Sequence, residues 1–361
     1  FRAAAKQLVR CLLPPPTPAQ MEQAIIAAGR AYLQVGITSV IEPGLTPEQI
    51  RAFQRVYQRG ELPLRVNVMP SWHGFLDTEN AADLEQRATQ LGLFSGMGNE
   101  WFRLGALKMA LDGGTTSRTA YMYEPFCGES RVINYNRLDT ASLVHYFRQA
   151  HELHWDIGIH CCGDRAQDMA VEALAQVVQA SSRSDARHQI IHAYFPTTKS
   201  LALMGEFSLG AVIQPTFIYF EGDDLFRDVG ASRAANYKPA RKYLEAHIPL
   251  AASSDVASTV SYNPFIGLYA LVTRKSWLHT PIAPDQALTR QEALTAYTRG
   301  GAWFTREEKE KGALLPGMLA DCIVIDRDYF RVPEEEITSI RVEMTVLHGE
   351  IVYQADPKAS P

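Results

Sequence analysis

Short apolar segments alternate with amphipathic segments along most of the chain. Each apolar segment is rich in Val, Ile, Leu or Ala and is bounded by polar, Gly or Pro residues, which is typical of a buried strand in a parallel sheet. The pattern predicts seven such strands, at residues 36–42, 64–69, 104–111, 156–160, 189–192, 210–214 and 249–253.

The segments between these strands carry apolar residues at the spacing of helices with one buried face. Thr17 before Pro18 and Thr46 before Pro47 are typical N-cap and first-turn residues. Strands that alternate with helices predict a parallel α/β fold. The predicted helices cover residues 18–35, 47–59, 139–153, 166–180 and 197–207.

The pattern changes after residue 305, where a fully charged run, 306–311, leads into a Gly/Pro turn. His348 and Gly349 lie between two apolar segments and predict a hairpin turn. The predicted strands of this tail are residues 321–325, 341–347 and 350–353.

The length of 361 residues suits a (β/α)8 TIM-type barrel with a small appendage. We predict an α/β fold in which residues 1–305 supply barrel strands two to eight and residues 306–361 supply part of a small β-sandwich. Seven strands are one fewer than a closed barrel needs, so the first barrel strand is predicted to be missing from this chain.

The net charge of -5 gives no reason to expect nucleic acid or an anionic membrane as a partner. No run of about 18 apolar residues occurs, so no membrane span is predicted. The five cysteines include no Cys-x-x-Cys pair, which favours reduced thiols and a cytoplasmic location. The sequence leaves a homo-oligomer open.

Polar residues lie at the ends of four predicted strands. Lys108 lies inside an otherwise apolar strand, His160 and His192 each end a strand, and Asp255 follows the last one. Catalytic groups of a (β/α)8 barrel gather at the carboxyl ends of its strands. Imidazole and carboxylate groups are zinc ligands, and a bound metal lowers the pKa of water toward about 7. The pattern therefore predicts a metal site that produces hydroxide at neutral pH.

Each of these residues also has a structural interpretation. A strand-end histidine is commonly a hydrogen-bonded structural residue, and Asp255 could be a helix N-cap. A buried lysine is costly unless it is neutralised, so Lys108 is informative by itself. The four residues together, in strand order, favour a shared site over four separate structural roles.

Several motifs in this order resemble the amidohydrolase superfamily, and within it the YtcJ-like branch, amidohydrolase family 3. The resemblance covers nearly the whole chain, and its most specific segments are SSD with NPF and PGMLAD. The motifs are PPPT (14–17), GITSV (36–40), LKMALDGGTTSRTA (107–120), HCCGDRA (160–166), IIHAYF (190–195), SSDVAS with NPF (253–265) and LLPGMLADCIVID (314–326).

The resemblance implies a site that holds one or two divalent metal ions, zinc foremost. In the family a first-strand His-x-His is joined by a fourth-strand lysine, often carboxylated, by fifth- and sixth-strand histidines and by an eighth-strand aspartate. These last four match Lys108, His160, His192 and Asp255. Asp255 is then implied as the general base, which takes a proton from water and passes it to the leaving nitrogen. The implied reaction is hydrolysis of a carbon–nitrogen bond in a small non-peptide amide or cyclic amide.

The chain departs from the family in two places. No His-x-His is present, so the chain resembles an N-terminally incomplete member, and an upstream segment or another chain is expected to supply that part. His151 and His154 are three apart, unlike a His-Glu-x-x-His helix, and are predicted to lie on the surface. Cys161 and Cys162 are expected to pack as buried thiols, with metal ligation as the alternative.

Residues just beyond the fourth predicted strand are candidates for substrate binding. Asp112 and Arg118 are expected to orient a polar substrate group. Tyr121 and Tyr123 follow in a loop that extends to about residue 137 and are expected to form a lid or pocket wall. Ordinary loop packing is the alternative for these residues. Two other functions also remain: an inactive remnant of the fold that holds no productive metal, and a metal-dependent esterase or lactonase.

Overall fold

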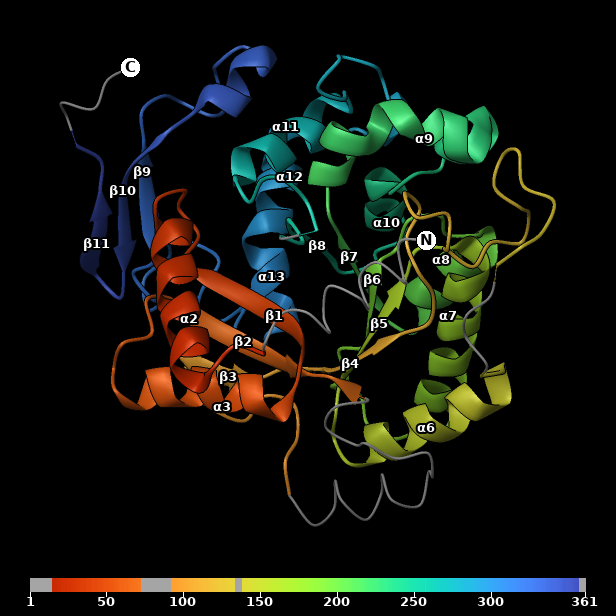
Figure 1. The fold of residues 1–361 in the computed structure, drawn as a ribbon, viewed down its shortest axis with the longest axis horizontal. Coiled ribbons are helices and arrows are strands. Elements are labelled where there is room, and N and C mark those ends of the chain that lie inside the picture. Colours follow the sequence, from red (N-terminus) through yellow and green to blue (C-terminus); the bar gives the residue numbers. More distant parts are fainter. Residues whose placement is uncertain (1–14, 73–91, 134–137, 257, 357–361) are drawn as a thin grey trace.

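The computed structural model describes residues 15–72, 92–133, 138–256 and 258–356. Within them, eight parallel strands form a three-stranded sheet, β1-β2-β3, and a five-stranded sheet, β4-β5-β6-β7-β8 (Figure 1). The strands are β1 (Ser39–Leu45), β2 (Arg65–Pro70), β3 (Phe102–Leu104), β4 (Leu107–Ala110), β5 (Ile157–Cys161), β6 (Gln189–His192), β7 (Gly210–Ile213) and β8 (Leu250–Ala252).

Helices connect the strands and cover the outer face of the sheets (Figure 1). Thr17 and Thr46 form capping boxes at the first two described helices, as the sequence predicts. The helices are α2 (Pro18–Leu33), α3 (Pro47–Gln58), α6 (Thr140–Glu152), α7 (Asp164–Gln179), α8 (Thr198–Glu206), α9 (Thr216–Ala234), α10 (Ala240–Glu245), α11 (Pro264–Thr273), α12 (Arg290–Tyr297) and α13 (Arg299–Phe304).

The predicted strand 104–111 contains β4, and the short strand β3 lies just before it and shares only Leu104 with the predicted range. β3 pairs with β2 and β4 pairs with β5, both in parallel, so the pairing partner changes between β3 and β4. Gly105 lies at this change, where a Cβ atom would overlap the side-chain oxygen of Asn67. A single parallel bridge from Ser71 to Lys108 links the two sheets. β3 and β4 together therefore fill one of the seven predicted strand positions.

The parallel α/β architecture is confirmed, and closure of the barrel is not. Within the described ranges β1 pairs only with β2, and β8 pairs only with β7. The described strands therefore form an open arrangement with β1 and β8 at its two edges.

The tail forms a three-stranded antiparallel sheet in the order β11-β10-β9, which confirms the predicted hairpin. Its turn residues, His348 and Gly349, both have positive φ, 56° and 80°. The strands of this tail are β9 (Cys322–Ile325), β10 (Val342–Leu347) and β11 (Glu350–Gln354).

An ion pair joins the tail to the parallel sheet. Arg65 of β2 pairs with the buried Asp321, with a distance of 2.7 Å between Nε and Oδ2.

The prediction that His151 lies on the surface is wrong. The residue is 1% exposed, at the end of α6 near the amino ends of the strands. Its Nδ1 lies 2.9 Å from Nε2 of His188. The Nδ1 of His188 in turn accepts a hydrogen bond from the backbone N–H of Ile157. Pairing with a second imidazole explains how this polar ring is accommodated in the interior.

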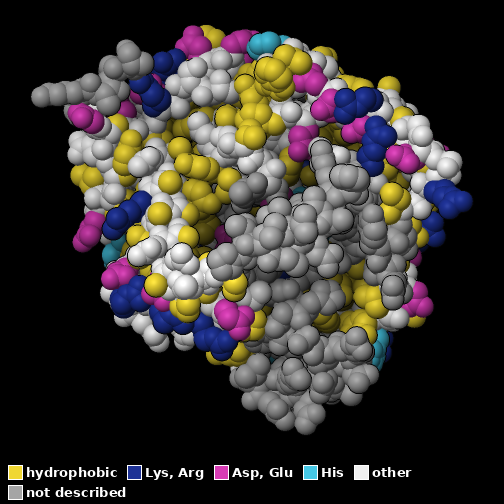
Figure 2. Space-filling view, in the orientation of Figure 1, with side chains coloured by type: hydrophobic (Ala, Val, Ile, Leu, Met, Phe, Trp, Pro, Cys, Tyr) yellow, Lys and Arg dark blue, Asp and Glu magenta, His cyan; other side chains and the backbone are white. Residues whose placement is uncertain are grey.

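Charged side chains of both signs are interspersed around the rim of the face that Figure 2 shows. In the described part of the chain, no helix combines the length and the apolar character needed to cross a membrane.

Candidate active site at the carboxyl ends of the strands

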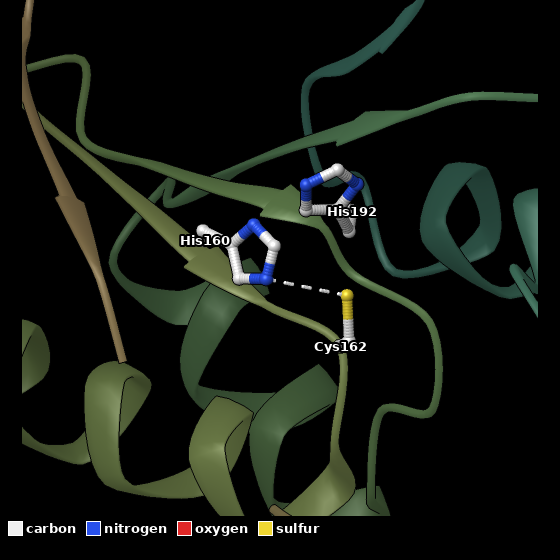
Figure 3. A group of neighbouring side chains, drawn as sticks. All are labelled: His160, Cys162 and His192. Carbon is white, nitrogen blue, oxygen red and sulfur yellow. Dashed lines mark hydrogen bonds between the residues drawn. The ribbon is translucent and has the colours of Figure 1, made fainter. Parts of the chain in front are cut away.

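The two strand-end histidines lie side by side. His160 lies near the end of β5 and His192 ends the neighbouring strand β6, with Cys161 paired to His192 in the register. The ring centroids are 4.2 Å apart and the rings meet edge to face at 74° (Figure 3). Two residues 32 positions apart in the sequence are thus brought together by parallel pairing, as the sequence predicts.

The hydrogen bonds of Gln214 define the proton position on His192. The side-chain Nε2 of Gln214 donates to the carbonyl of Val212, at 3.3 Å, and to Oγ of Ser253, at 3.2 Å. Its Oε1 therefore faces His192, and Nδ1 of His192 donates to it at 2.8 Å. In the neutral ring this leaves the Nε2 lone pair of His192 free.

His160 has the opposite tautomer. Its Nε2 lies 3.1 Å from the carbonyl oxygen of Gly113, which can only accept a hydrogen bond. Nε2 therefore carries the proton, and the lone pair of the neutral ring lies on Nδ1. Asp112 Oδ1 lies 3.6 Å from the same Nε2 and favours this assignment.

Electrostatics keep both imidazoles neutral. Burial and the charges of Lys108 and Lys238 lower the pKa of His160 to about 4. Burial, His160 and the same two lysines hold the pKa of His192 well below its ordinary value. Neutral imidazole is the form that binds metal, so the chemistry of this donor pair fits a divalent cation.

Cys162 lies beside the histidine pair. Its Sγ is 3.5 Å from Nε2 of His160, and one donor atom from each of Cys162, His160 and His192 lies within 4.8 Å of the others (Figure 3). The thiol faces the protonated nitrogen of His160, and burial raises its pKa well above the usual value. Both facts favour a packing role. Cys161 points the other way, into the main core beside α7.

Lys108, Asp255 and Glu42 are close enough for their charges to interact. Burial lowers the pKa of Lys108 to about 8, against opposing effects of Cys161 and Asp255. Burial raises the pKa of Asp255, while Lys238 and Lys108 act to lower it. Burial and Asp255 together raise the pKa of Glu42 in β1. Asp255 also has a φ of 59°, a conformation that aspartate tolerates better than most residues.

The loop after β4 is fixed by Asp112. Its Oδ1 accepts from the backbone N–H of Cys162 at 3.0 Å, and its Oδ2 accepts from those of Gly163 and Tyr121 at 2.7 and 2.9 Å. Burial raises the pKa of Asp112 to about 6, against these hydrogen bonds. A Cβ atom on Gly163 would overlap the carbonyl of Tyr121, so this approach requires glycine.

Two other predicted substrate residues contact the neighbouring helices. Arg118 pairs with Asp228 of α9 at 2.7 Å, and the hydroxyl of Tyr123 donates to Asp168 of α7 at 2.9 Å. The ring of Tyr121 lies under the guanidinium of Arg165, 4.8 Å from ring centroid to Cζ. These contacts support the loop-packing alternative for Arg118 and Tyr123. Residues 134–137 of the predicted loop lie outside the described residues.

Sequence reasoning missed three residues of this site. Gln214 and Glu42 end predicted strands, and the signal that singled out the two histidines applied to them as well. Lys238 lies between α9 and α10 and gave no such signal. It is wholly buried, with its Nζ 3.1 Å from the ring centroid of Tyr194.

The fold is that of solved metal-dependent hydrolases. Two uncharacterized metal-dependent hydrolases, from Pyrococcus horikoshii OT3 and Pyrococcus furiosus, align with TM-scores of 0.76 and 0.77. Both are 23% identical to this chain; the alignments cover 89% and 92% of it and 62% and 65% of those chains.

The sequence places the chain more narrowly. Residues 1–353 match the profile of the amidohydrolase family, and the chain belongs to that family. The YtcJ protein of Bacillus subtilis (strain 168), named as an amidohydrolase, is 24% identical over 359 residues, 97% of this chain and 64% of the relative. The N-substituted formamide deformylase of Arthrobacter pascens is 23% identical over 326 residues, 90% of this chain and 58% of the relative. The chain thus spans about 58 to 64% of the length of these relatives.

Proposed function

We propose that this protein is a metal-dependent amidohydrolase that hydrolyses a carbon–nitrogen bond in a non-peptide amide or a cyclic amide. Membership of the amidohydrolase family supports this function. So does the name of one relative, an N-substituted formamide deformylase. The observation that carries the proposal is the pair of neutral imidazoles, His160 and His192, with hydrogen bonds that leave one lone pair free on each.

Lys108, His160, His192 and Asp255 are the residues that we propose hold the metal. A bound divalent cation, with zinc as our first choice, supplies a Lewis acid that lowers the pKa of water and polarises a carbonyl group. Gln214 and Gly113 hold the two imidazoles in the required tautomers, because each accepts the proton of the nitrogen that faces away. The lowered pKa of Lys108 leaves more of its amine uncharged, and the uncharged amine is the form that reacts with carbon dioxide.

Asp255 is the general base in this proposal. Its carboxylate accepts a proton from the attacking water and later donates it to the leaving nitrogen. Burial raises the pKa of the group above that of a solvent-exposed aspartate, which makes it a stronger base. Lys108 and Lys238 oppose that shift and so favour the ionised form.

The loop that carries Asp112, Arg118, Tyr121 and Tyr123 forms the proposed wall on one side of the substrate. The contacts of Arg118 with Asp228 and of Tyr123 with Asp168 hold this loop in place. Asp112 fixes the backbone of this wall and does not contact the substrate itself, because both of its oxygens accept backbone hydrogen bonds.

We also propose a cytoplasmic location. The free cysteines among the described residues agree with it.

Metal analysis combined with a substrate screen tests this proposal. We expect about one or two zinc ions per chain and turnover of N-substituted amides, both lost in His192→Ala and retained in His145→Ala, a variant of a histidine on α6 outside the site. Metal without amide turnover but with turnover of esters or lactones would indicate the esterase alternative. A protein that holds no metal would indicate the inactive remnant.

A further inference from the structure

Lys238 has a buried amine without a hydrogen-bond acceptor. The residue is 0% exposed, and its Nζ makes no hydrogen bond within the described part of the chain. Three aromatic rings surround it, with Nζ 3.1 Å from the ring centroid of Tyr194 and 4.9 Å from those of Phe217 and Tyr237. Ring faces attract a cation but cannot accept the hydrogen bonds that an ammonium group donates.

The backbone of Lys238 is held in an unfavourable conformation. Its φ is 46°, in the left-handed region that a lysine seldom adopts. The wholly buried Arg274 donates from Nη1 to the carbonyl of Lys238, at 3.2 Å, and from Nη2 to that of Tyr237, at 2.7 Å. The N–H of Lys238 donates to the carbonyl of Tyr194 at 2.7 Å. A strained backbone and an unsatisfied buried amine at one residue are typical of functional sites.

The amine lies behind the histidine pair. The ring of Tyr194 contacts Lys238 with its face, and it meets the ring of His192 edge to face with a centroid distance of 5.5 Å. Burial lowers the pKa of Lys238 well below its ordinary value, against the charges of Glu221 and Asp255. In its charged form the amine acts on Asp255, His160 and His192 alike. Lys238 is therefore placed to interact with a molecule that occupies the proposed site.

We propose that Lys238 is the binding group for a carboxylate on the substrate, so that the preferred substrates are amides that carry an acidic group. A carboxylate supplies the acceptor oxygens that the amine lacks and stabilises its charged form, in a charge-assisted hydrogen bond. The flexible four-carbon stem of lysine allows Nζ to leave the face of Tyr194 and reach the ligand. The inference rests on the proposed function for the identity of the reacting bond, but the binding of an anion can be measured without turnover.

Thermal shift with a matched pair of ligands tests the anion site directly. We expect phenylacetate to raise the Tm of the protein as purified, and its neutral analogue phenylacetamide to leave the Tm unchanged. In Lys238→Met the affinity for phenylacetate should fall by at least about tenfold, the loss of one charge-assisted hydrogen bond. Lys199→Met, which removes an exposed lysine paired with Glu172, should keep the full shift. An unchanged shift in Lys238→Met would overturn the proposal, because the anion would then bind elsewhere.

Stability in the absence of ligand separates binding from a structural role. A lysine retained only for packing would lower the Tm when replaced by methionine. A lysine retained for binding should leave the Tm of Lys238→Met equal or higher, because the buried amine without an acceptor is removed. If Lys238→Met does not fold, Lys238→Gln, neutral but polar, takes its place in both measurements. A large loss of Tm with phenylacetate binding retained would contradict the proposal.

Turnover of N-acetylglycine and N-acetylglycinamide links the anion site to catalysis. The ratio of the KM for the acid to the KM for the amide should rise about tenfold in Lys238→Met. An equal ratio in both proteins would overturn the proposal. If phenylacetate binding depends on Lys238 but the protein holds no metal and hydrolyses no amide of the screen, the anion site stands and the proposed hydrolase function fails.

Discussion

Two pairs of histidines lie at opposite ends of the same strands. His151 and His188 meet at the amino ends, and His160 and His192 meet at the carboxyl ends. Both pairs are buried or nearly so, and burial lowers the pKa of all four rings. The two pairs differ in how their nitrogen atoms are used.

Three of the four ring nitrogens of the amino-end pair are hydrogen-bonded. Nδ1 of His188 accepts from Ile157, so Nε2 of His188 carries the proton and donates to Nδ1 of His151. The surrounding charges are paired as well, since Arg183 and Arg306 both contact Asp156, at 2.8 and 2.9 Å. Both ring lone pairs at this end therefore accept a hydrogen bond. Nε2 of His151, which carries the proton, has no partner among the described residues.

The carboxyl-end pair uses one nitrogen of each ring, and no described residue donates a hydrogen bond to the other. Nearby, Nζ of Lys238 has no acceptor in the described part of the chain. The comparison shows that burial and a lowered pKa do not by themselves identify a functional histidine. The free lone pairs do, because no donor among the described residues satisfies them.

Replacing Asp255 should give the largest effect on activity. The amide introduced by Asp255→Asn cannot accept the proton from water, so we expect this variant to lower kcat by about 100- to 10,000-fold, the usual contribution of a general base. Asparagine tolerates a positive φ, so the Tm should change little. Steady-state kinetics and thermal unfolding check both statements. Turnover retained in the folded variant would contradict the role of Asp255.

Removing one histidine from each pair tests the comparison itself. His192→Ala should weaken zinc binding by more than about 100-fold, beyond the loss typical of an outer contact. His188→Ala should keep the metal and lose about 1–3 kcal/mol of stability, because the N–H of Ile157 loses its acceptor. Metal titration measures the zinc affinity of both variants, and urea unfolding measures their stability. Loss of metal in His188→Ala would remove the distinction between the two ends.

Gln214 should affect the metal more weakly. Gln214→Leu removes the acceptor of the His192 proton, and we expect zinc affinity to fall about 10- to 100-fold. Gln214→Glu keeps an acceptor oxygen at the same reach and serves as the control. Equal zinc affinity in the wild type and in Gln214→Leu would show that the tautomer of His192 does not depend on Gln214.

The smallest expected effect is a pH dependence at the amino end. Burial and Arg183 lower the pKa of His151 to about 4, below the ordinary value of about 6.5. The unfolded chain therefore binds a proton between these values that the folded protein does not, so stability falls as the pH drops from 6.5 to 4 and is fully present above 6.5. His151→Asn keeps an acceptor for His188 and should reduce this slope by up to about 1.4 kcal/mol per pH unit. Urea unfolding at several pH values measures the slope, and an unchanged slope would refute the assignment.

The sequence predicted the strand order and the meeting of His160 with His192, because parallel strands align their carboxyl ends. It did not predict the change of partner at Gly105, which depends on the side chain of Asn67 in a neighbouring strand. The burial of His151 depends on His188, 37 positions away, and no local pattern signals such a pair. Lys238 was missed for the same reason, because its aromatic surroundings come from three separate segments.

The ion pair between Arg65 and Asp321 makes the tail and the parallel sheet mutually dependent. The two side chains are 1% and 6% exposed, and two hydrogen bonds of 2.7 and 3.0 Å join them across 256 positions of sequence. Removing either partner would leave a buried charge unpaired, a loss of about 3–5 kcal/mol. A chimaera that exchanges the tail with that of a relative must therefore carry over the matching residue in β2, and the two segments are expected to evolve as a unit.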